Sequence, residues 1–572
     1  MIGVITLFSR IVGLAREMVG AYYFGANAIW AAWKVAFTVP NLFRKLFGEG
    51  ALSAAFIPLY AQAVKRERGV EGEPAVEGEP AGEPSRDGCP PPDGSAGASP
   101  STTAAEFAAA SVNLLVGILI GLTLIGEGVL LALAVFAPLR PDHLLTVHLS
   151  MIMLPYVLLV CGTAFLSAIL QVHGRFAAPA ATSIVLNVCL ITAIVISAQL
   201  FNLTTDAGQQ AAVRWLSWGV LISGVVQVAM LLPSLHAAGF KFRIAVNIWT
   251  PAVRRMLSLT GPVALGASVL QIGVLMDKGL AIALAEAPGQ TMIHPFDQAI
   301  RLPMAEGAAA RLDLAQFMYQ FPLGVFAIAL ATAIFPKLAA EATGDLNKVA
   351  ASEAFRSVLR RGIEASLFIG LPASAGMMLV ALPAARLLFQ HGKFTATDAE
   401  WVALSTALYA SAIWAFSLLQ IINRAYYALH DAATPLKWVA VNLLLNVIIE
   451  IPLIFTPLRE SGMAVGTLVS FSIQSIAMLW ILNRRTGGIG LRLIAGNVLK
   501  MIFATLLMSG ACAAVIYSPI YPASAGKLSW ALQVAIIMVV GAGVYFGACF
   551  GMGIDVLKNF RKRVIRSQPT ET

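Results

Sequence analysis

Residues 114–136 read LLVGILIGLTLIGEGVLLALAVF, and Glu127 is the single charged residue among them. A run of about 20 apolar residues is long enough to cross the hydrocarbon core of a bilayer as an α-helix. Membrane β-barrels are built instead from alternating segments of about 10 residues. The stretch therefore predicts a transmembrane helix within an all-α integral membrane protein.

Similar apolar runs recur along the whole chain. We expect about fourteen transmembrane helices, with ends placed to within a few residues. The second run contains Pro40, Gly48, Gly50 and Pro58, so we expect it to kink or to break into two helical pieces. The runs lie near residues 2–24, 29–64, 106–138, 144–172, 177–201, 212–235, 256–285, 312–340, 362–384, 400–429, 434–456, 461–483, 495–518 and 528–553.

The composition of the 572-residue chain excludes several classes of protein. Hydrophobic residues make up 58% and charged residues 12%, whereas soluble domains average about 25% charged residues. A cytosolic enzyme, a secreted disulfide-rich protein and a disordered protein are thereby excluded. We interpret the net charge of +9 as basic cytoplasmic loops and not as nucleic-acid binding. The five cysteines form no CxxC pair and are interpreted as small buried apolar side chains.

Lysine and arginine are distributed unevenly over the loops. With both termini placed in the cytoplasm, the cytoplasmic segments hold 25 of these residues and the opposite loops hold 8. This ratio favours cytoplasmic termini and an even number of helices. Segment 66–105 repeats the sequence VEGEPA and lacks the apolar residues needed to fold, so we expect a disordered cytoplasmic linker. Residues 286–311 form a second polar insertion.

Short repeats six helices apart indicate an internal duplication. The sequence AFIP at 55–58 ends the second run, and AIFP at 333–336 ends the eighth. We expect two six-helix bundles around a central cavity, followed by two further C-terminal helices. The predicted domains are 1–65 (first two helices), 66–105 (acidic linker), 106–235 (rest of the N-terminal bundle), 236–485 (C-terminal bundle), 486–555 (two extra helices) and 556–572 (basic cytoplasmic tail).

Charged residues inside the first two apolar runs are the best candidates for function. A charge at membrane depth costs at least about 2.5–3.5 kcal/mol on insertion scales, so it usually faces a protein interior or a water-filled cavity. Arg10, Arg16 and Arg44 together indicate a site for phosphate or diphosphate, because a guanidinium stays charged and forms bidentate bonds to phosphate oxygens. Alternatively, Arg44 and Lys45 are interfacial anchors, and Arg10 reaches the cytoplasmic edge.

The helical periodicity groups some of these residues. Arg10 and Glu17 lie about 20° apart around a helix, with Gly13 and Gly20 on the same side, which suits a cavity wall. We expect acidic residues of these two runs to orient the arginines or to gate the cavity by ion pairing. The supporting residues are Glu17, Asn41, Lys45, Glu49 and Lys34.

Asp277 and Lys278 form a second charged position inside a predicted helix. Adjacent helical residues point about 100° apart, so these two need not pair with each other. Asp277 is a candidate for binding a coupling cation or for neutralising the arginines, and a structural interhelical ion pair is the alternative. The sequence contains no HExxH, GxSxG or P-loop pattern. We therefore expect no catalytic residue, no metal site and no cofactor beyond a coupling monovalent cation or the membrane potential.

Several of these segments resemble the MurJ/MviN family of lipid II flippases. The most specific is PNLFRKLFGEGA at 40–51, and FSR at 8–10, followed by Gly13, Arg16 and Glu17, resembles the opening of the family. Supporting matches are RFAAPA at 175–180, FPLGVF at 321–326, GKFT at 392–395 and YYA at 426–428. The resemblance covers nearly the whole chain except 66–105 and 286–311.

The resemblance implies a fourteen-helix fold of the multidrug/oligosaccharidyl-lipid/polysaccharide exporter superfamily. It implies a transporter, not an enzyme, in the bacterial cytoplasmic membrane, and places Arg10, Arg16 and Arg44 in the cavity that receives the substrate diphosphate. Its substrate would be the polyprenyl-diphosphate-linked muropeptide, lipid II. Membrane lipids and cell-wall synthesis proteins are the other partners implied, and nucleic acid is not.

Two positions depart from the family pattern. An acidic residue common in the family near the outer end of the second helix is replaced by Ala31, and a family arginine in the eighth helix is replaced by Phe317. Lys34, Lys278 and Arg311 are candidates to supply the replacement charge. Drift of the substrate or of the coupling is the alternative explanation.

The sequence therefore predicts a flippase that moves lipid II outward by alternating access for cell-wall synthesis. A flippase for another polyprenyl-diphosphate-linked glycan and a cation-coupled exporter of the same superfamily are alternatives. A membrane scaffold without transport activity is a further alternative, favoured by the losses at Ala31 and Phe317. A membrane-embedded glycosyltransferase should carry an acidic metal motif in an outer loop, and none is present.

Overall fold

The computed structural model describes residues 2–48, 51–70, 104–240, 248–293, 299–342, 352–522 and 524–554. Each of the fourteen apolar runs is helical, so the all-α prediction is confirmed. Three of the cysteines, Cys161, Cys512 and Cys549, are buried free thiols, as expected, while Cys189 is half-buried. Cys89 and most of the predicted linker 66–105 lie outside the described residues.

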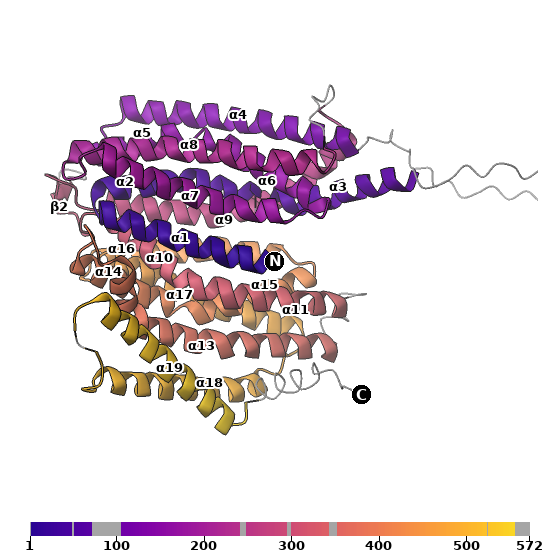
Figure 1. Ribbon diagram of the computed structural model, residues 1–572. Helices are drawn as coiled ribbons and strands as arrows, with labels where there is room; N and C mark the ends of the chain where they lie inside the picture. Colours follow the sequence, from indigo (N-terminus) through magenta and orange to yellow (C-terminus); the bar gives the residue numbers. More distant parts are fainter. Residues whose placement is uncertain are drawn as a thin grey trace, which may run out of the picture. The chain divides into compact units, whose positions relative to one another are not determined.

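The helices of the first half have the following bounds (Figure 1): α1 (Ile2–Phe24), α2 (Ala28–Phe43), the π-helical turn η1 (Arg44–Gly48), α3 (Ala51–Val70), α4 (Ala104–Phe136), α5 (Pro141–Met153), α6 (Tyr156–Val172), α7 (Ala177–Leu200), α8 (Asp206–His236) and α9 (Pro251–Ala283).

The described residues of the second half form two short strands and further helices: β1 (Met292–Ile293), β2 (Ile300–Arg301), α10 (Ala308–Pro322), the π-helical turn η3 (Leu323–Ala327), α11 (Ile328–Glu341), α13 (Glu353–Phe389), α14 (Ala396–Ala410), α15 (Ile413–Ala428), α16 (Ala433–Ile454), α17 (Ser461–Arg485), α18 (Leu491–Ile516) and α19 (Lys527–Gly551).

The predicted break in the second apolar run is confirmed. Helix α2 contains Pro40 and passes into the π-helical turn η1, and α3 follows. The eighth run breaks in the same way, because α10 ends at Pro322, η3 follows, and α11 continues. Each π-helical turn precedes one of the two repeated motifs, AFIP or AIFP, so the internal duplication extends to a local backbone irregularity. Such π-turns are frequent at functional sites.

Length and composition identify the membrane-spanning helices. Among the described residues, eight helices are long and apolar enough to cross a membrane. The number rises to ten if the bent pairs α5–α6 (44°) and α14–α15 (40°) each count as one span. The first two helices fall short for a physical reason: α1 carries three charges within 23 residues, and α2 has only 16 residues. The protein is a multi-pass membrane protein, and α1 and α2, which hold many of the charged candidates, do not count among the eight spans.

The chain separates into two compact units. Unit 1 comprises 1–16, 36–201 and 211–271, and unit 2 comprises 17–35, 202–210 and 272–572. This division differs from the predicted domain boundaries in three places. Residues 236–271, predicted in the C-terminal bundle, group with unit 1. Glu17–Val35, predicted with the first two helices, and Asn202–Gln210, predicted in the N-terminal bundle, group with unit 2. Helices α1 and α2 therefore each contribute to both units.

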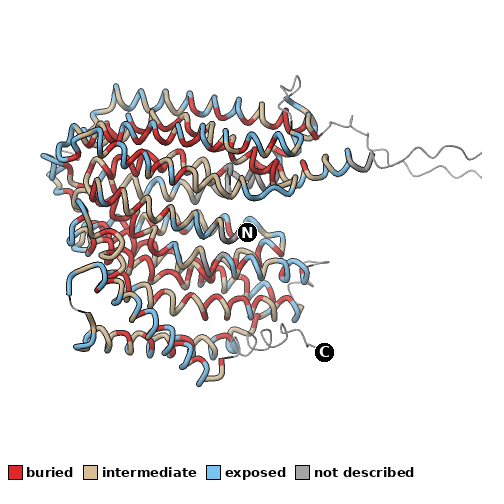
Figure 2. The backbone as a smooth tube through the Cα atoms, viewed as in Figure 1, coloured by how far each residue is buried: buried red, intermediate tan, exposed pale blue. Residues whose placement is uncertain are grey.

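In unit 1, α6 is the central helix, packing against α3, α4, α7 and η1. An aromatic contact joins it to α3, because the ring centre of Phe56 lies 4.3 Å from that of Phe165. Within α3, Phe56 also stacks on Tyr60 at a centroid distance of 5.2 Å. Helix α4 is peripheral, and its buried residues lie between Ala104 and Thr123. Figure 2 shows the remainder of α4 in the colours of intermediate and exposed residues, as expected of a helix that faces lipid.

In unit 2, α13 is the central helix, with α11, α14, α15, α18 and α19 packed against it. Figure 1 shows the two C-terminal helices α18 and α19 beside α13. The Tyr545 hydroxyl on α19 donates to the carbonyl of Phe368 at 2.8 Å, and Asn497 on α18 donates to Glu364 at 2.9 Å. The two extra helices are thus joined to α13 by hydrogen bonds as well as by apolar packing.

The second polar insertion is shorter than predicted. Helix α10 already begins at Ala308, inside the predicted segment 286–311, and the described part of the insertion forms a small antiparallel hairpin. Gly307 caps α10 in a left-handed conformation with a φ of 78°, and a Cβ there would lie 2.2 Å from the carbonyl oxygen of Ala26. Glycine is thus required where the start of α10 approaches the α1–α2 turn.

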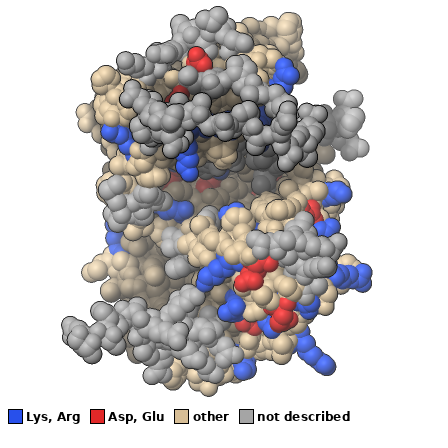
Figure 3. Space-filling model, turned by 90° about the vertical axis from the view of Figure 1, so that its right-hand side faces the viewer, with Lys and Arg blue, Asp and Glu red and all other residues tan. Residues whose placement is uncertain are grey.

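Basic residues gather at the end of unit 2 where α13 begins. Arg356 and Arg360 donate to the carbonyls of Gly488 and Ile489, at 3.3 and 2.9 Å, in the α17–α18 connection. Arg485 pairs with Asp431 in the α15–α16 connection. Figure 3 faces this end, and Lys and Arg side chains stand out on it. These connections were predicted to be cytoplasmic, and the cytoplasmic placement of the termini remains a prediction.

Candidate functional site

The three arginines predicted to bind diphosphate all belong to unit 1. Arg10 and Arg16 lie on α1, Arg44 is the first residue of η1, and all three are half-buried. The guanidinium carbon of Arg16 lies 5.9 Å from the centre of the Phe37 ring on α2. The Arg44 Nε donates to Asn41 Oδ1 at 2.9 Å. Unit 1 thus carries Arg10 and Arg16 on α1, and Arg44 at the π-helical turn that follows α2.

The break itself is held by packing from other helices of unit 1. The turn η1 contacts α3 and α6, and Cys161 Sγ on α6 lies 3.9 Å from the Phe43 carbonyl. Asn187 on α7 is adjacent to α1, because a Cβ on Gly13 would lie 3.6 Å from its Nδ2. Lys45 is half-buried on the same turn, and Glu49 lies outside the described residues.

In unit 2 the structure brings together four charged residues from four helices. Glu17 of α1 pairs with Lys34 of α2. The Lys34 Nζ also lies 3.1 Å from Asp313 Oδ2 of α10, and the second Asp313 oxygen pairs with Lys278 of α9. The order Glu17–Lys34–Asp313–Lys278 alternates in sign, and we call this set the lysine chain. Two carboxylates balance two ammonium groups within it.

Lys34 is held in this chain by aromatic packing. Its Nζ lies 5.4 Å from the centre of the Trp30 ring, within reach of a cation–π interaction. Trp30 stacks between Phe24 and Trp33 at centroid distances of 4.6 and 4.9 Å. Gly20 faces the same ring, and a Cβ there would lie 2.6 Å from Trp30 Cζ2. The predicted glycine-lined stripe therefore serves at Gly20 to pack α1 closely against α2.

Asp277, the neighbour of Lys278, points into a different cluster. The Asn446 side-chain nitrogen lies 3.4 Å from Asp277 Oδ1 and donates to Glu450 Oε2 at 2.8 Å. Ser470 Oγ donates to Asn446 Oδ1 at 3.4 Å. The other Glu450 oxygen is buried without a hydrogen-bond partner among the described residues. Asp277 and Lys278, which the helical periodicity did not require to pair, take part in separate groups.

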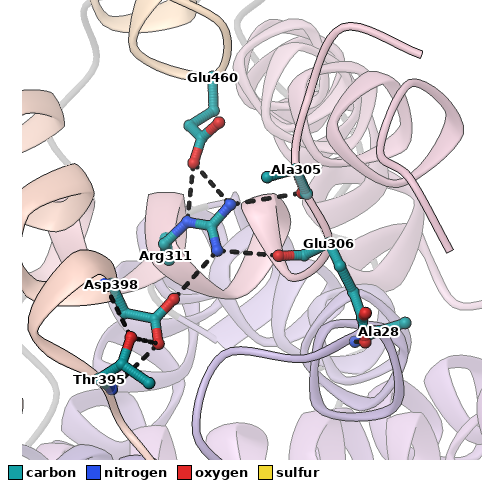
Figure 4. Close-up of polar contacts among 7 residues, drawn as sticks. All are labelled: Ala28, Ala305, Glu306, Arg311, Thr395, Asp398 and Glu460. Carbon is teal, nitrogen blue, oxygen red and sulfur yellow. Dashed lines mark hydrogen bonds and ion pairs between the residues drawn. The ribbon is translucent and has the colours of Figure 1, made fainter. Parts of the chain in front are cut away.

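Arg311 is not available as replacement charge. Figure 4 shows its guanidinium enclosed by Glu460, Asp398 and the carbonyl groups of two residues that precede α10. Its Nε donates to Glu460 Oε1 at 2.7 Å, and its Nη1 lies 3.2 Å from Asp398 Oδ1. Its Nη1 and Nη2 also donate to the carbonyl oxygens of Glu306 and Ala305, at 2.8 and 3.3 Å. This Arg311 cluster has a structural role, and Lys34 and Lys278 remain the candidates.

Sequence reasoning missed Asp313 and Glu450. Both are acidic residues within apolar runs, the signal used for Glu17 and Asp277, so the same rule applied to every run would have found them. Asp313 lies at the start of the apolar run 312–340, two residues after the predicted polar insertion. Phe317, where a family arginine is absent, is half-buried one turn after Asp313 on α10.

No group of three or more His, Cys, Asp or Glu within the described ranges could hold a metal ion.

Comparison with known proteins identifies the family. The family model described as "Lipid II flippase MurJ" matches residues 20–522. The chain belongs to the MurJ family. Its motif PNLFRKLFGEGA contains η1, and FPLGVF contains most of η3, so both π-helical turns fall within segments that resemble the family.

Relatives cover almost the full length of the chain. A probable lipid II flippase MurJ of Rhizobium tropici is 28% identical over 99% of this chain and 96% of its own length. The corresponding protein of Rhizobium meliloti is 29% identical over 99% and 95%. The lipid II flippase MurJ of Burkholderia cenocepacia is 27% identical over 84% and 82%.

Solved structures support the fold. A structure of lipid II flippase MurJ in an inward closed conformation matches with a TM-score of 0.69 and 20% identity, covering 97% of this chain and 99% of that one. An inward-facing multidrug transporter of the MATE family matches with a TM-score of 0.58 and 13% identity, over 85% and 98%. The chain therefore has the fold shared by MurJ and MATE transporters of the MOP superfamily.

Proposed function

We propose that this protein flips lipid II from the inner to the outer leaflet of the bacterial cytoplasmic membrane by alternating access. Membership of the lipid II flippase MurJ family over most of the chain is the observation that carries the proposal. The fold agrees with transport, since its relatives include transporters captured in inward-facing and outward-facing conformations. Both termini are placed in the cytoplasm, in accordance with the distribution of basic residues.

In this proposal Arg10, Arg16 and Arg44 hold the substrate diphosphate. All three belong to one unit, and all are half-buried, so a guanidinium can be fixed by protein and still reach a ligand. Phosphate oxygens accept paired hydrogen bonds from such groups. Asn41 orients Arg44 through its 2.9 Å hydrogen bond. The lipid tail remains in the bilayer while the headgroup passes through the protein.

We further propose that a monovalent cation binds at Asp277 and Glu450. Two carboxylates and the side-chain oxygens of Asn446 and Ser470 supply hard oxygen ligands, which alkali cations prefer. The buried Glu450 oxygen that lacks a partner provides an unused ligand position. A bound cation would also neutralise the acidic pair. The membrane potential contributes about 2.3 kcal/mol per charge per 100 mV to such a cycle.

The test is lipid II exposure on the outer face of bacteria depleted of their own flippase and expressing this chain. The full chain should restore exposure and growth, and Arg44→Ala should abolish both while the folded protein persists in the membrane. Arg301→Ala, which removes an exposed arginine of unit 2, is the matched control and should retain full activity. Retained exposure in Arg44→Ala would overturn the diphosphate site.

The alternatives predict different results in the same cells. A flippase for another polyprenyl-diphosphate-linked glycan leaves lipid II exposure absent although the chain inserts, and it should still require Arg44. A scaffold without transport activity restores no exposure and tolerates alanine at Arg10, Arg16 and Arg44. Asp277→Asn tests the coupling proposal, because it should reduce exposure and remove its dependence on the cation gradient.

A further inference from the structure

The members of the lysine chain differ in their access to solvent. The side chains of Glu17 and Lys34 are 3% and 5% exposed, Lys278 is 14% exposed, and Asp313 is 23% exposed. The most accessible member is thus the carboxylate that contacts both ammonium groups. The Asp313 carboxylate contacts both ammonium groups, so a ligand that replaced it would contact both lysines.

The two lysines are anchored to different degrees. Lys34 contacts Glu17 and Asp313 and lies over the ring of Trp30. For Lys278, the ion pair that the described residues provide is the one with Asp313. If the Asp313 carboxylate moved away, Lys34 would keep its ion pair with Glu17, and Lys278 would lose its ion pair with Asp313. The set would then present a net positive charge.

The Asp313 carboxylate can move without a change in the backbone. Rotation about the Cα–Cβ bond takes a short side chain between staggered positions at little cost. The backbone of α10 stays fixed meanwhile, because Arg311 is bound to Glu460 and Asp398. Lys34 remains in place through Glu17 and Trp30, while Lys278 stays attached to α9. The structure thus places an acid that can rotate over one anchored ammonium group and one that is free to follow a new anion.

We propose that the lysine chain is an exchangeable anion site, in which a phosphate-type group of the lipid-linked substrate replaces Asp313 on Lys34 and Lys278. Oxyanions of this class accept charge-assisted hydrogen bonds from more than one ammonium group. Asp313 returns to the lysines when the anion leaves, which keeps the set neutral in the empty protein. The inference rests on the proposed function, because it assigns a second contact to the same anionic headgroup.

A purely structural ion-pair network makes the opposite prediction for Asp313. If Asp313 only joins α2, α9 and α10, replacing it by asparagine should loosen the protein and leave anion binding unchanged or weaker. If Asp313 competes with the ligand, Asp313→Asn should strengthen anion binding, because the internal competitor is lost. The sign of the change therefore separates the two roles.

The experiment measures binding of farnesyl diphosphate, a short prenyl diphosphate, to the full-length protein in lipid nanodiscs by calorimetry. We expect Asp313→Asn to tighten binding by at least about fivefold and Lys278→Gln to weaken it by a similar factor, the usual scale of coupling between competing groups. Arg301→Gln removes one exposed positive charge from the same unit and should leave the dissociation constant unchanged. Near-ultraviolet circular dichroism verifies that each variant is folded.

An unchanged or weaker dissociation constant for folded Asp313→Asn would overturn the exchange. Arg44→Ala, measured alongside, separates this failure from failure of the proposed function. Loss of binding in Arg44→Ala with no effect of Asp313→Asn leaves the arginine site standing and removes the exchange. Tighter binding in Asp313→Asn with full binding and lipid II exposure in Arg44→Ala supports the exchange and removes the arginine site.

Discussion

Arg311 and Asp313 lie two residues apart on α10, yet they belong to charge groups of opposite character. Arg311 is enclosed by two carboxylates and two carbonyl groups, and its side chain is 4% exposed (Figure 4). Asp313 contacts two lysines and remains partly open to solvent. Residues two apart on a helix point about 160° away from each other. One helix thus carries a structural ion cluster on one side and an accessible one on the other.

The difference shows why a buried charge alone does not identify a functional residue. Both groups satisfy the rule that buried charges are paired. They differ in how many contacts each charge makes and in whether one member can leave. A charge whose hydrogen-bonding positions are filled by protein has little capacity for a ligand, whereas an accessible carboxylate over two lysines can be replaced.

The largest expected effect is at Arg311. Arg311→Met should reduce the free energy of unfolding by about 3–5 kcal/mol, because it leaves Glu460 and Asp398 buried without their cation. Thermal denaturation in detergent measures the loss, and Arg301→Met at a 74% exposed position is the control. An unchanged melting temperature for Arg311→Met would remove the structural side of the comparison.

A smaller effect is expected at Glu460. Its side chain is fully buried, and its Oε1 accepts from Arg311. Glu460→Gln keeps an acceptor but removes the charge, so we expect a loss of about 2 kcal/mol, the scale of a hydrogen bond to a charged group. Glu400→Gln, at the exposed partner of Arg386, is the control and should change little. If both variants behave alike, the burial of Glu460 contributes nothing.

The lysine chain should be less important for stability than for transport. Lys278→Gln should cost about 1 kcal/mol of unfolding free energy, since Asp313 keeps Lys34 as its partner. The same variant should reduce lipid II exposure several-fold. Denaturation and exposure measured on one preparation compare the two losses. A stability loss as large as that of Arg311→Met, with normal exposure, would make the lysine chain a second structural cluster.

The smallest effect is expected at Asp431, outside the membrane spans. Burial raises its pKa, but hydrogen bonds from Thr434 and Arg485 outweigh this and lower the pKa below its usual value. A lowered pKa stabilises the fold above the unfolded pKa of about 3.9, and this stabilisation is lost as pH falls through the folded pKa. Asp431→Asn should therefore destabilise by less than about 1 kcal/mol at pH 7.

The pH dependence of the melting temperature checks that expectation. The difference between Asp431→Asn and the unaltered chain should shrink as the pH falls below 4. A difference that grows toward low pH would contradict it. The measurement gives the stability contribution of a solvent-accessible ion pair that lies outside the lysine chain.

The sequence alone determined the membrane fold. The apolar runs are helical because a chain segment inside a bilayer must satisfy its backbone hydrogen bonds internally. The break between α2 and α3 followed from Pro40 and the glycines after it, and the family from motifs such as residues 40–51. These features are local, so they can be read along the chain.

Only the tertiary structure decided which charges meet. Glu17 lies seven residues from Arg10 on the same face of α1, yet it pairs with Lys34 on α2. Lys34 in turn pairs with Asp313, which is far along the chain. The sequence made Arg311 a candidate to supply replacement charge, but in the structure it pairs with Glu460 and Asp398. Ion pairs depend on distances of a few ångström between helices remote in sequence. The packing of α1, α2, α9 and α10 sets those distances, and no local pattern encodes them.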